Sequence, residues 1–535
     1  MEQGFYEYAR PVMAGLFIYL LLMLAVGWWS HKRIKNTDDF IVAGRRLPLF
    51  LTTGTLFATW FCGGTLMGTA AQSYLFGNQG VIFDPWGSTL SLLLTGLVFG
   101  RLMRRGGYLT VIDFFDLRYG KKMGLLASLV QVVAEIGWVG GQLVAFGVIL
   151  QFFAGIPFFW GVALSCAVLV VYTYLGGMWS VTLTDFLQAG LIIGGTAVLL
   201  FTVVPLAGGW GELLASAGNR AGIPAGALLP TKEHGYLGYF GLPGWFYYLG
   251  AWLSTGLGDI PSQDLAQRLL AAKNERTASW SAILAALLYL VVGMIPVLLG
   301  SLMYGLNPGL ATAETEMILP HLATSYLPPV LTAIFAVALV ATLMSSSDSA
   351  LLAAASIVGR NVLRYFHPGA GSALTLKVTR LCIPFIAVSS LLIACYAGTI
   401  YMLIVIAWSL ILVGLFAPFA AGYFWKQSNQ SGAVAALTGG LFSWILAILY
   451  FLDRVTLKTG SGTTGSSEMA IWDAVYMGSV PAFAVSIVLL VLVSLATQKK
   501  DPPRPLVDIA GRPFHPRLFK IRGAPAARSG ILRRR

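Results

Sequence analysis

The sequence predicts an all-α polytopic membrane protein with thirteen transmembrane helices. Three observations predict this class: the composition, the recurrence of long apolar stretches, and the placement of lysine and arginine. Hydrophobic residues make up 57% of the 535 residues, and charged residues only 11%. Soluble proteins carry about 25% charged residues. A water-soluble chain of this composition would expose a large apolar surface, so a soluble enzyme or binding domain is excluded.

Thirteen stretches have the roughly 20 apolar residues that a helix needs to cross a bilayer. The first has no basic leader and is long enough to span, so we expect no cleavable signal peptide. The four cysteines lie within such stretches and form no CxxC pair, which predicts neither disulfides nor a metal centre. The predicted spans are residues 11–30, 47–77, 80–100, 123–153, 157–175, 180–206, 238–262, 278–304, 322–358, 375–397, 399–425, 431–452 and 471–497.

Lysine and arginine predict the orientation, because they favour cytoplasmic loops. With the N-terminus outside, thirty of the thirty-five fall on the cytoplasmic side, and eleven of these thirty are in the C-terminal tail. An odd number of spans then places the basic C-terminal tail inside as well. The net charge of +13 therefore meets anionic lipid headgroups, and no nucleic-acid motif is present. We expect a multi-pass protein of the cell membrane.

Two predicted spans contain helix-breaking residues near their middle. Gly63-Gly64 interrupts the span 47–77, and Gly256 to Pro261 interrupts the span 238–262. Glycine loosens a helix and proline removes a donor. Gly63-Gly64 alone is also typical of a close helix contact, but the second break lies five spans later. Paired interruptions are typical of the binding site between inverted repeats of a transporter.

These breaks divide the chain into five regions. We predict an extra helix and loop at 1–46, a first five-helix repeat at 47–206 and a second, inverted repeat at 207–425. Two further helices follow at 426–498, and a basic, mostly disordered cytoplasmic tail occupies 499–535.

Serines and an acid share one face of the span 322–358. Ser345, Asp348 and Ser349 are spaced i, i+3 and i+4, so they point in one direction. Sodium prefers oxygen ligands, and hydroxyls facing carbonyls freed from a broken helix would supply them. Serines in membrane helices also bond to their own backbone. An acid inside the membrane is costly and indicates a functional site.

Five further acids lie in or beside predicted spans. For Asp185 two roles are open, an ion pair near the cytoplasmic surface or a functional site. Asp264 precedes Arg268 by four residues, which predicts a structural pair. Trp138 follows Glu135 by three residues, and Trp60 lies in the first break. Aromatic faces beside an acid suit an organic cation. The five acids are Asp84, Glu135, Asp185, Asp259 and Asp264.

Several motifs together resemble the sodium:solute symporter family over residues 11–497. They are the Asp-Phe-x-x-Ala-Gly-Arg stretch at 39–45, the break at 60–65, Gly176-Gly177 through Gln188, the pair Gln267-Arg268 and the serine run 345–349. The chain is most similar to the choline-carrier branch. That similarity rests on Ala58-Thr59-Trp60 with Gly63-Gly64, the loop Arg105-Gly106-Gly107-Tyr108, and Ser345–Ser349 with Arg360-Asn361.

The resemblance implies a ten-helix inverted-repeat core of the LeuT type, with helices added at both ends. It implies a main sodium site from the carbonyls of Ala58, Phe61 and Thr342 and the hydroxyls of Ser345 and Ser346. It implies a second sodium site, present in some members, from Asp185, Ser345, Asp348 and Ser349. Asp348 stands where some members have serine.

The resemblance to choline carriers is incomplete at the solute site. Trp60 and Trp138 match the expected aromatic residues, whereas Ser88, Ser262 and Ile404 stand where aromatics are expected. Asp84 and Asp259 could compensate by charge, which points to another cation or a zwitterion. The expected solute-binding residues are Trp60, Thr65, Asp84, Ser88, Glu135, Trp138, Asp259, Ser262 and Ile404.

We therefore expect a sodium-coupled symporter that imports a small polar solute such as choline, another organic cation or a zwitterion. Its partners would be the solute, sodium ions and the bilayer, with no covalent chemistry and no cofactor. A sodium- or proton-coupled carrier of an amino acid or osmolyte is the alternative. A passive channel would need a continuous polar face, and a transporter-like sensor would need a signalling domain longer than the tail.

Overall fold

The computed structural model describes residues 2–216, 228–233, 235–396, 400–459 and 467–516. Within these ranges the chain is helical, with isolated β-bridges and no strand. The helices are α1 (Glu2–His31), α2 (Thr37–Val42), α3 (Leu49–Trp60), α4 (Thr69–Phe76), α5 (Ser88–Leu94), α6 (Gly100–Gly106), α7 (Val111–Arg118), α8 (Lys121–Ala154), α9 (Phe158–Leu206), α10 (Gly209–Ser216), α11 (Gly241–Gly256), α12 (Gln263–Ala271), α13 (Glu275–Leu306), α14 (Ile318–Tyr326), α15 (Pro329–Ile357), α16 (Leu363–Phe366), α17 (Ser372–Tyr396), α18 (Ile400–Ile411), α19 (Ala417–Phe424), α20 (Gln430–Thr459) and α21 (Ser467–Thr497).

Ten helical segments in the described ranges are long and apolar enough to cross a membrane, or eleven if α3 and the bent helix after it form one span. This confirms an all-helical, multi-pass protein. The ten are Tyr8–Ser30, Ile82–Gly106, Lys121–Ala154, Phe158–Leu206, Glu275–Leu306, Pro329–Phe366, Ser372–Tyr396, Ile400–Phe424, Gln430–Asp453 and Ile471–Thr497.

The difference from thirteen spans lies at helix breaks. The predicted spans 157–175 and 180–206 are joined in α9, a helix of 49 residues interrupted at Gly177, which has φ 51° and ψ −158°. The predicted span 238–262 corresponds to α11, which has only 16 residues before its break. The count of thirteen therefore stays a prediction.

The first predicted interruption is present, with a bend of 60° between Leu49–Trp60 and Gly64–Gln79. Helix α3 ends at Trp60, and a π-helical turn, η2 (Gly64–Gly68), leads into α4. The Gly63 N–H donates to Gln142 Oε1 of α8 at 2.9 Å. A Cβ at Gly63 would come within 2.7 Å of the Leu343 side chain on α15, so glycine permits this close approach.

The second predicted interruption is also present, between the end of α11 at Gly256 and the start of α12 at Gln263. Gln131 of α8 makes two hydrogen bonds to this connection, both at its α12 end. Its Nε2 donates to the Pro261 carbonyl at 2.8 Å, and its Oε1 accepts from the Gln263 N–H at 3.1 Å. Polar side chains of α8 thus satisfy the free backbone groups of both breaks, as a membrane interior requires.

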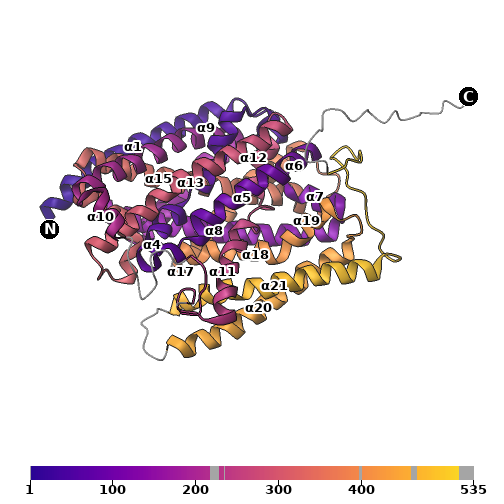
Figure 1. Ribbon diagram of the computed structural model, residues 1–535. Coiled ribbons are helices and arrows are strands. Elements are labelled where there is room, and N and C mark those ends of the chain that lie inside the picture. Colours follow the sequence, from indigo (N-terminus) through magenta and orange to yellow (C-terminus); the bar gives the residue numbers. More distant parts are fainter. Residues whose placement is uncertain (1, 217–227, 234, 397–399, 460–466, 517–535) are drawn as a thin grey trace, which may run out of the picture.

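Helix α15 lies at the centre of the bundle and packs against α8 and α9. Of its most apolar window 83% is buried, compared with 22% for α21. Helices α20 and α21 pack on each other along one edge of the molecule (Figure 1). The serines of α15 are therefore placed in the most protected part of the protein, beside the first break.

Part of the predicted disordered tail is packed against the body of the protein. The Ile509 N–H donates to the Gly106 carbonyl at 2.9 Å, and the Tyr108 hydroxyl donates to the Val507 carbonyl at 2.7 Å. Asn429 Nδ2 also donates to the Asp501 carbonyl at 2.8 Å. These hydrogen bonds tie residues 501–509 to the end of α6, to Tyr108 and to Asn429. Residues 517–535 lie outside the described ranges.

Candidate functional site: a serine cage, an arginine cluster and an aromatic cavity

The break after α3 frees two backbone carbonyls. In a continuous helix the N–H groups of Cys62 and Gly63 would bond to the carbonyls of Ala58 and Thr59. Here they point to Thr65 Oγ1 at 3.4 Å and to Gln142 Oε1 at 2.9 Å. The carbonyls of Ala58 and Thr59 are therefore available to another partner.

Two serine hydroxyls of α15 donate hydrogen bonds to these carbonyls. Ser345 Oγ donates to the Ala58 carbonyl at 2.7 Å, and Ser346 Oγ donates to the Thr59 carbonyl at 2.8 Å. Both hydroxyls also lie near the Thr342 carbonyl, at 2.9 and 3.3 Å. All five residues are buried. We call the group formed by Ala58, Thr59, Thr342, Ser345 and Ser346 the serine cage.

The serine cage unites four of the five residues predicted for the main sodium site, and adds Thr59. Phe61 follows the end of α3 with φ −75° and ψ 86°, and its ring packs against Tyr289 at 5.5 Å between centroids. Among the described hydrogen bonds, none joins Phe61 to Ser345 or Ser346. Three carbonyls and two hydroxyls form a neutral oxygen set, the kind of ligand that hard cations such as sodium take.

A second polar group adjoins the cage and contains the predicted residues Asp185, Asp348 and Ser349. Asp185 is fully buried in the protein, and of the two roles left open for it the structure shows an ion pair, with Arg268. It accepts hydrogen bonds from Thr55 and, at 3.3 Å, from Thr59 Oγ1. The carboxylate of Asp348 accepts hydrogen bonds from Tyr172 and, at 3.1 Å, from Ser349.

Arg268 of α12 enters the same group. Its Nη2 is bonded to the Ser349 hydroxyl and lies 3.8 Å from Asp185 Oδ2, and its Nε donates to Thr59 Oγ1 at 2.9 Å. The predicted pair with the Asp264 carboxylate is corrected, because Arg268 Nη1 donates to the Asp264 backbone carbonyl at 2.9 Å. We call Thr59, Asp185, Arg268, Asp348 and Ser349 the arginine cluster.

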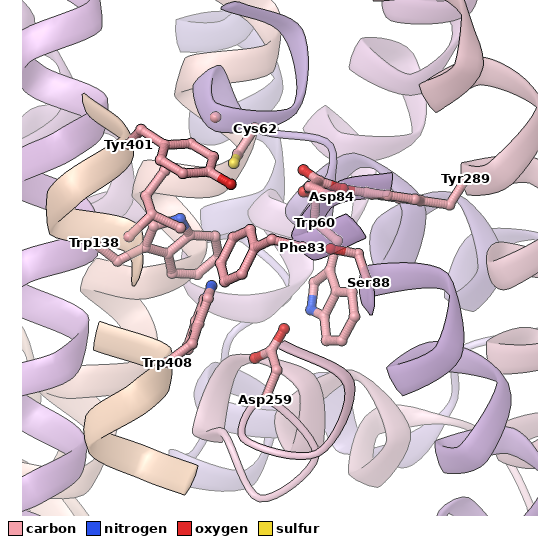
Figure 2. A pocket seen from close by; sticks show the side chains of 12 residues that line it. Trp60, Cys62, Phe83, Asp84, Ser88, Trp138, Asp259, Tyr289, Tyr401 and Trp408 are labelled. Carbon is pink, nitrogen blue, oxygen red and sulfur yellow. The ribbon is translucent and has the colours of Figure 1, made fainter. Parts of the chain in front are cut away.

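A narrow cavity lies where the two breaks meet (Figure 2). Its volume of about 20 Å³ admits little more than one water molecule. An organic solute can therefore enter only if the side chains around it move apart. We call this space the aromatic cavity. Its walls are Trp60, Cys62, Gly64, Phe83, Asp84, Ser88, Trp138, Asp259, Tyr289, Tyr401, Ile404 and Trp408.

Six of the nine predicted solute residues line this cavity: Trp60, Asp84, Ser88, Trp138, Asp259 and Ile404. Thr65 does not line the cavity but hydrogen-bonds to Asp84, which does. Thr65 Oγ1 donates to Asp84 Oδ2 at 2.7 Å, and the Tyr289 hydroxyl donates to Asp84 Oδ1 at 2.8 Å. Hydroxyl donors from two different helices thus fix the Asp84 carboxylate at the cavity.

The remaining two predicted residues, Glu135 and Ser262, do not line the cavity. Both are buried, and neither Glu135 carboxylate oxygen nor the Ser262 hydroxyl has a hydrogen-bond partner among the described residues. One oxygen of Asp259 and one of Asp264 are also unpartnered. Trp60 Nε1 donates to the other Asp264 oxygen at 3.3 Å, which connects the first break to the second.

The cavity has aromatic walls that the sequence reading missed. Trp408 packs against Trp138 with ring centroids 5.1 Å apart, and Tyr401 packs against Phe83 at 5.5 Å. Tyr401, Ile404 and Trp408 are spaced i, i+3 and i+7, so they share one face of α18. That spacing is the signal that could have added Tyr401 and Trp408 to Ile404.

The comparisons with known proteins agree with this geometry. The model of the "Sodium:solute symporter family" matches residues 40–440. The chain belongs to the sodium:solute symporter family. It is 31% identical to the High affinity choline transporter 1 of Homo sapiens over 450 residues, covering 80% of this chain and 75% of that protein. It is 25% identical to the Osmoregulated proline transporter of Bacillus subtilis, covering 91% of this chain and 95% of that protein.

A solved structure shows the same fold. A substrate-bound, outward-open Na+-coupled sialic acid symporter has a TM-score of 0.72 to this chain at 21% identity. The match covers 93% of this chain and 99% of the other. As a sodium:solute symporter the protein is a transporter rather than an enzyme, and sodium is its coupling ion.

Proposed function

We propose that this symporter imports a small organic cation across the cell membrane, driven by the inward sodium gradient. The observation that carries the proposal is the first break, which contributes to both the serine cage and the aromatic cavity. Ala58 and Thr59 offer carbonyls to the cage, and Trp60, Cys62 and Gly64 form cavity wall. A cation bound at the cage would therefore fix the shape of the solute site.

Sodium binding in the serine cage requires little rearrangement. Ser345 and Ser346 now donate their hydroxyl hydrogens to carbonyls. Rotating these hydrogens away directs the oxygen lone pairs toward the centre of the cage, where carbonyls already point. We propose Ala58, Thr342, Ser345 and Ser346 as ligands, with Thr59 added and Phe61 as a further carbonyl.

The arginine cluster is the proposed place of a second coupling ion. Asp185 and Asp348 are two carboxylates, and Arg268 is the single guanidinium among them. Two ionised acids and one arginine leave one negative charge, which a second sodium bound with Ser345 and Ser349, or a proton, would neutralise. A buried charge without such a partner is costly.

A cationic solute is favoured by the walls of the aromatic cavity. Two carboxylates, Asp84 and Asp259, and the ring faces of Trp60, Trp138 and Trp408 line it, whereas no lysine, arginine or histidine does. The similarity to choline transporters supports a cation. The similarity to a proline transporter keeps an amino acid or another zwitterionic osmolyte as the second candidate.

We further propose thirteen spans with the N-terminus outside and the C-terminus in the cytoplasm. At 1.5 Å per residue, the 49 residues of α9 reach about 74 Å, more than twice the roughly 30 Å hydrocarbon core. Helix α9 then makes two spans, α3 with α4 one, and α11 with α12 one. The start of α1 and the end of α21 lie at opposite ends of the bundle (Figure 1), as an odd number requires.

This count is compatible with two inverted five-helix repeats at 47–206 and 207–425. Each repeat would begin with its interrupted helix, α3 to α4 in the first and α11 to α12 in the second. The segment 1–46 and the helices within 426–498 would lie outside the repeats, and the tail 499–535 would be cytoplasmic.

Uptake of labelled choline into proteoliposomes tests the proposal. An inward sodium gradient should accumulate label above the external concentration, and an equal potassium gradient should not. Equilibration without accumulation would indicate a channel, and would contradict the proposal. If choline is not transported, other organic cations and then proline are to be tested in the same two salts. A protein that binds these solutes but accumulates none would be a sensor.

A further inference from the structure

The charge of the aromatic cavity is not balanced by the protein. Asp84 receives hydrogen bonds from two neutral hydroxyls, those of Thr65 and Tyr289. Asp259 is 2% exposed, and its Oδ1 has no hydrogen-bond partner among the described residues. No ion pair of the described residues includes either acid. A positively charged solute would supply the counter-charge that the described residues do not provide to these two acids.

The carboxylate of a zwitterionic solute would find no basic side chain among the described cavity walls, and the unpartnered N–H of Trp138 on that wall is a neutral donor. Broken helices often offer free N–H groups to anionic solutes. At the first break, however, the N–H groups of Cys62 and Gly63 are already bonded to Thr65 Oγ1 and Gln142 Oε1. Because the cavity walls also lack a basic side chain, the geometry favours a cation without a carboxylate.

A quaternary ammonium such as that of choline satisfies aromatic faces but has no N–H to donate. Asp259 lines the cavity and keeps one unpartnered acceptor, its buried Oδ1, and each oxygen of Asp84 keeps a further lone pair. Hydrogen bonds from a charged donor to a carboxylate are stronger than neutral ones. A protonated amine can both contact the aromatic faces and donate N–H hydrogen bonds to the carboxylates. Its charged group is also smaller than a trimethylammonium group, which suits the narrow cavity.

We propose that the solute is a small amine that carries N–H donors, held between Asp84 and Asp259 and against the aromatic rings. Figure 2 shows the two carboxyl groups facing the cavity from opposite sides, with Trp60 drawn between them. This inference rests on the proposed cation symport and specifies its substrate class. It explains why acids line a cavity in which Ser88 and Ile404 replace the expected aromatics.

A graded series of labelled substrates tests the inference. Ethanolamine, N-methylethanolamine, N,N-dimethylethanolamine and choline share one skeleton, and their ammonium groups carry three, two, one and no N–H. Sodium-dependent uptake into proteoliposomes should weaken along the series. We expect the half-saturating concentration to rise at least about tenfold from ethanolamine to choline, which is about 1.4 kcal/mol.

The variant Asp259→Asn should abolish most of this preference, because its neutral amide no longer favours a charged donor. The control Glu275→Gln removes a carboxylate that pairs with Arg105 away from the cavity, and should keep the wild-type order. Thermal unfolding in detergent checks that Asp259→Asn is folded. If it is not, the wild-type series alone decides the matter.

The outcomes separate the inference from the function on which it rests. Equal uptake of all four compounds, or the tightest binding for choline, would overturn the amine inference and leave sodium-driven cation import standing. Lack of sodium-dependent uptake for all four would overturn both. A stepwise loss of sodium-dependent uptake with each added methyl group supports the amine inference, provided that Asp259→Asn reduces the differences between the four compounds.

Discussion

The serine cage and the aromatic cavity share the same helix break but differ in how their polar groups are satisfied. In the cage the hydroxyls of Ser345 and Ser346 donate to backbone carbonyls. In the cavity Asp259 keeps an unpartnered oxygen, and Asp84 is held only by neutral hydroxyls. The cage is neutral and internally bonded, whereas the cavity carries acids that the protein does not neutralise.

This difference indicates how the two sites can be coupled. The cage can accept a small cation by rotating hydroxyl hydrogens, but the cavity must open before an organic cation fits. The short stretch from Ala58 to Gly64 belongs to both. A cation that fixes the cage therefore changes the cost of opening the cavity, and thermodynamic linkage makes the effect reciprocal.

Removal of both cage hydroxyls should have the largest effect. Each hydrogen bond or contact to a charged group contributes about 1.5–3 kcal/mol. The double variant Ser345→Ala, Ser346→Ala should therefore weaken sodium binding by at least about a hundredfold. Sodium-dependent uptake in proteoliposomes, measured as a function of sodium concentration, checks this. Without such a loss, the cage is not the sodium site.

Ser347 provides a matched control for this double variant. Its hydroxyl is buried on the same helix but donates to the Leu343 carbonyl at 2.7 Å, within α15. Ser347→Ala should leave sodium dependence unchanged. An equal loss in Ser347→Ala would mean that the double variant acts through the packing of α15 rather than through sodium ligands.

Replacing Arg268 of the arginine cluster should have the second-largest effect. Arg268→Met removes the cation 3.8 Å from Asp185 and leaves that buried acid without its ion-pair partner. Removing one partner of a buried pair costs about 3–5 kcal/mol. Denaturant titration in detergent micelles should show this lower stability. The double variant Asp185→Asn, Arg268→Met should recover much of it; if it does not, charge pairing is not what Arg268 supplies.

Local sequence chemistry was sufficient to predict the two interruptions and the serine face. Gly63-Gly64 and Pro261 weaken helical structure locally, and the spacing of Ser345, Asp348 and Ser349 sets their common direction. These features depend on neighbours in sequence. The structure has both breaks at the predicted positions for that reason, whereas the contact of Ser345 with Ala58 was implied by the family resemblance and not by local spacing.

What the sequence could not predict depends on partners distant in the chain. Gln142 and Gln131 of α8 hold the two breaks, and neither has a local pattern that indicates it. The side chain of Arg268 on α12 extends to Asp185 of α9, a helix distant in the chain, whereas its neighbour Asp264 was the partner that spacing suggested. Trp408 differs from these, because its spacing from Ile404 on α18 was a local signal that the sequence analysis did not use.

A smaller effect is expected for Asp348, which belongs to the arginine cluster and has no acidic counterpart in the neutral serine cage. Asp348→Asn should abolish uptake driven by a proton gradient, since the amide cannot bind a proton in place of sodium. Sodium-driven uptake should persist with an affinity lower by about tenfold, equivalent to roughly 1.4 kcal/mol. Uptake under separate proton and sodium gradients measures both. Unchanged proton-driven uptake would remove Asp348 from ion coupling.

The smallest effect is expected for a single aromatic wall of the cavity, and it can separate the two sites most cleanly. Trp408→Leu removes a ring face that stands against Trp138, and cation–π contacts contribute about 0.5–2 kcal/mol each. Solute affinity should fall by about three- to thirtyfold. Sodium binding measured without solute should not change, because Trp408 does not contribute to the serine cage. Trp280→Leu is the control, since that ring is 49% exposed on α13. If Trp408→Leu weakened sodium binding as much as solute binding, the cage and the cavity would form a single site rather than two coupled ones.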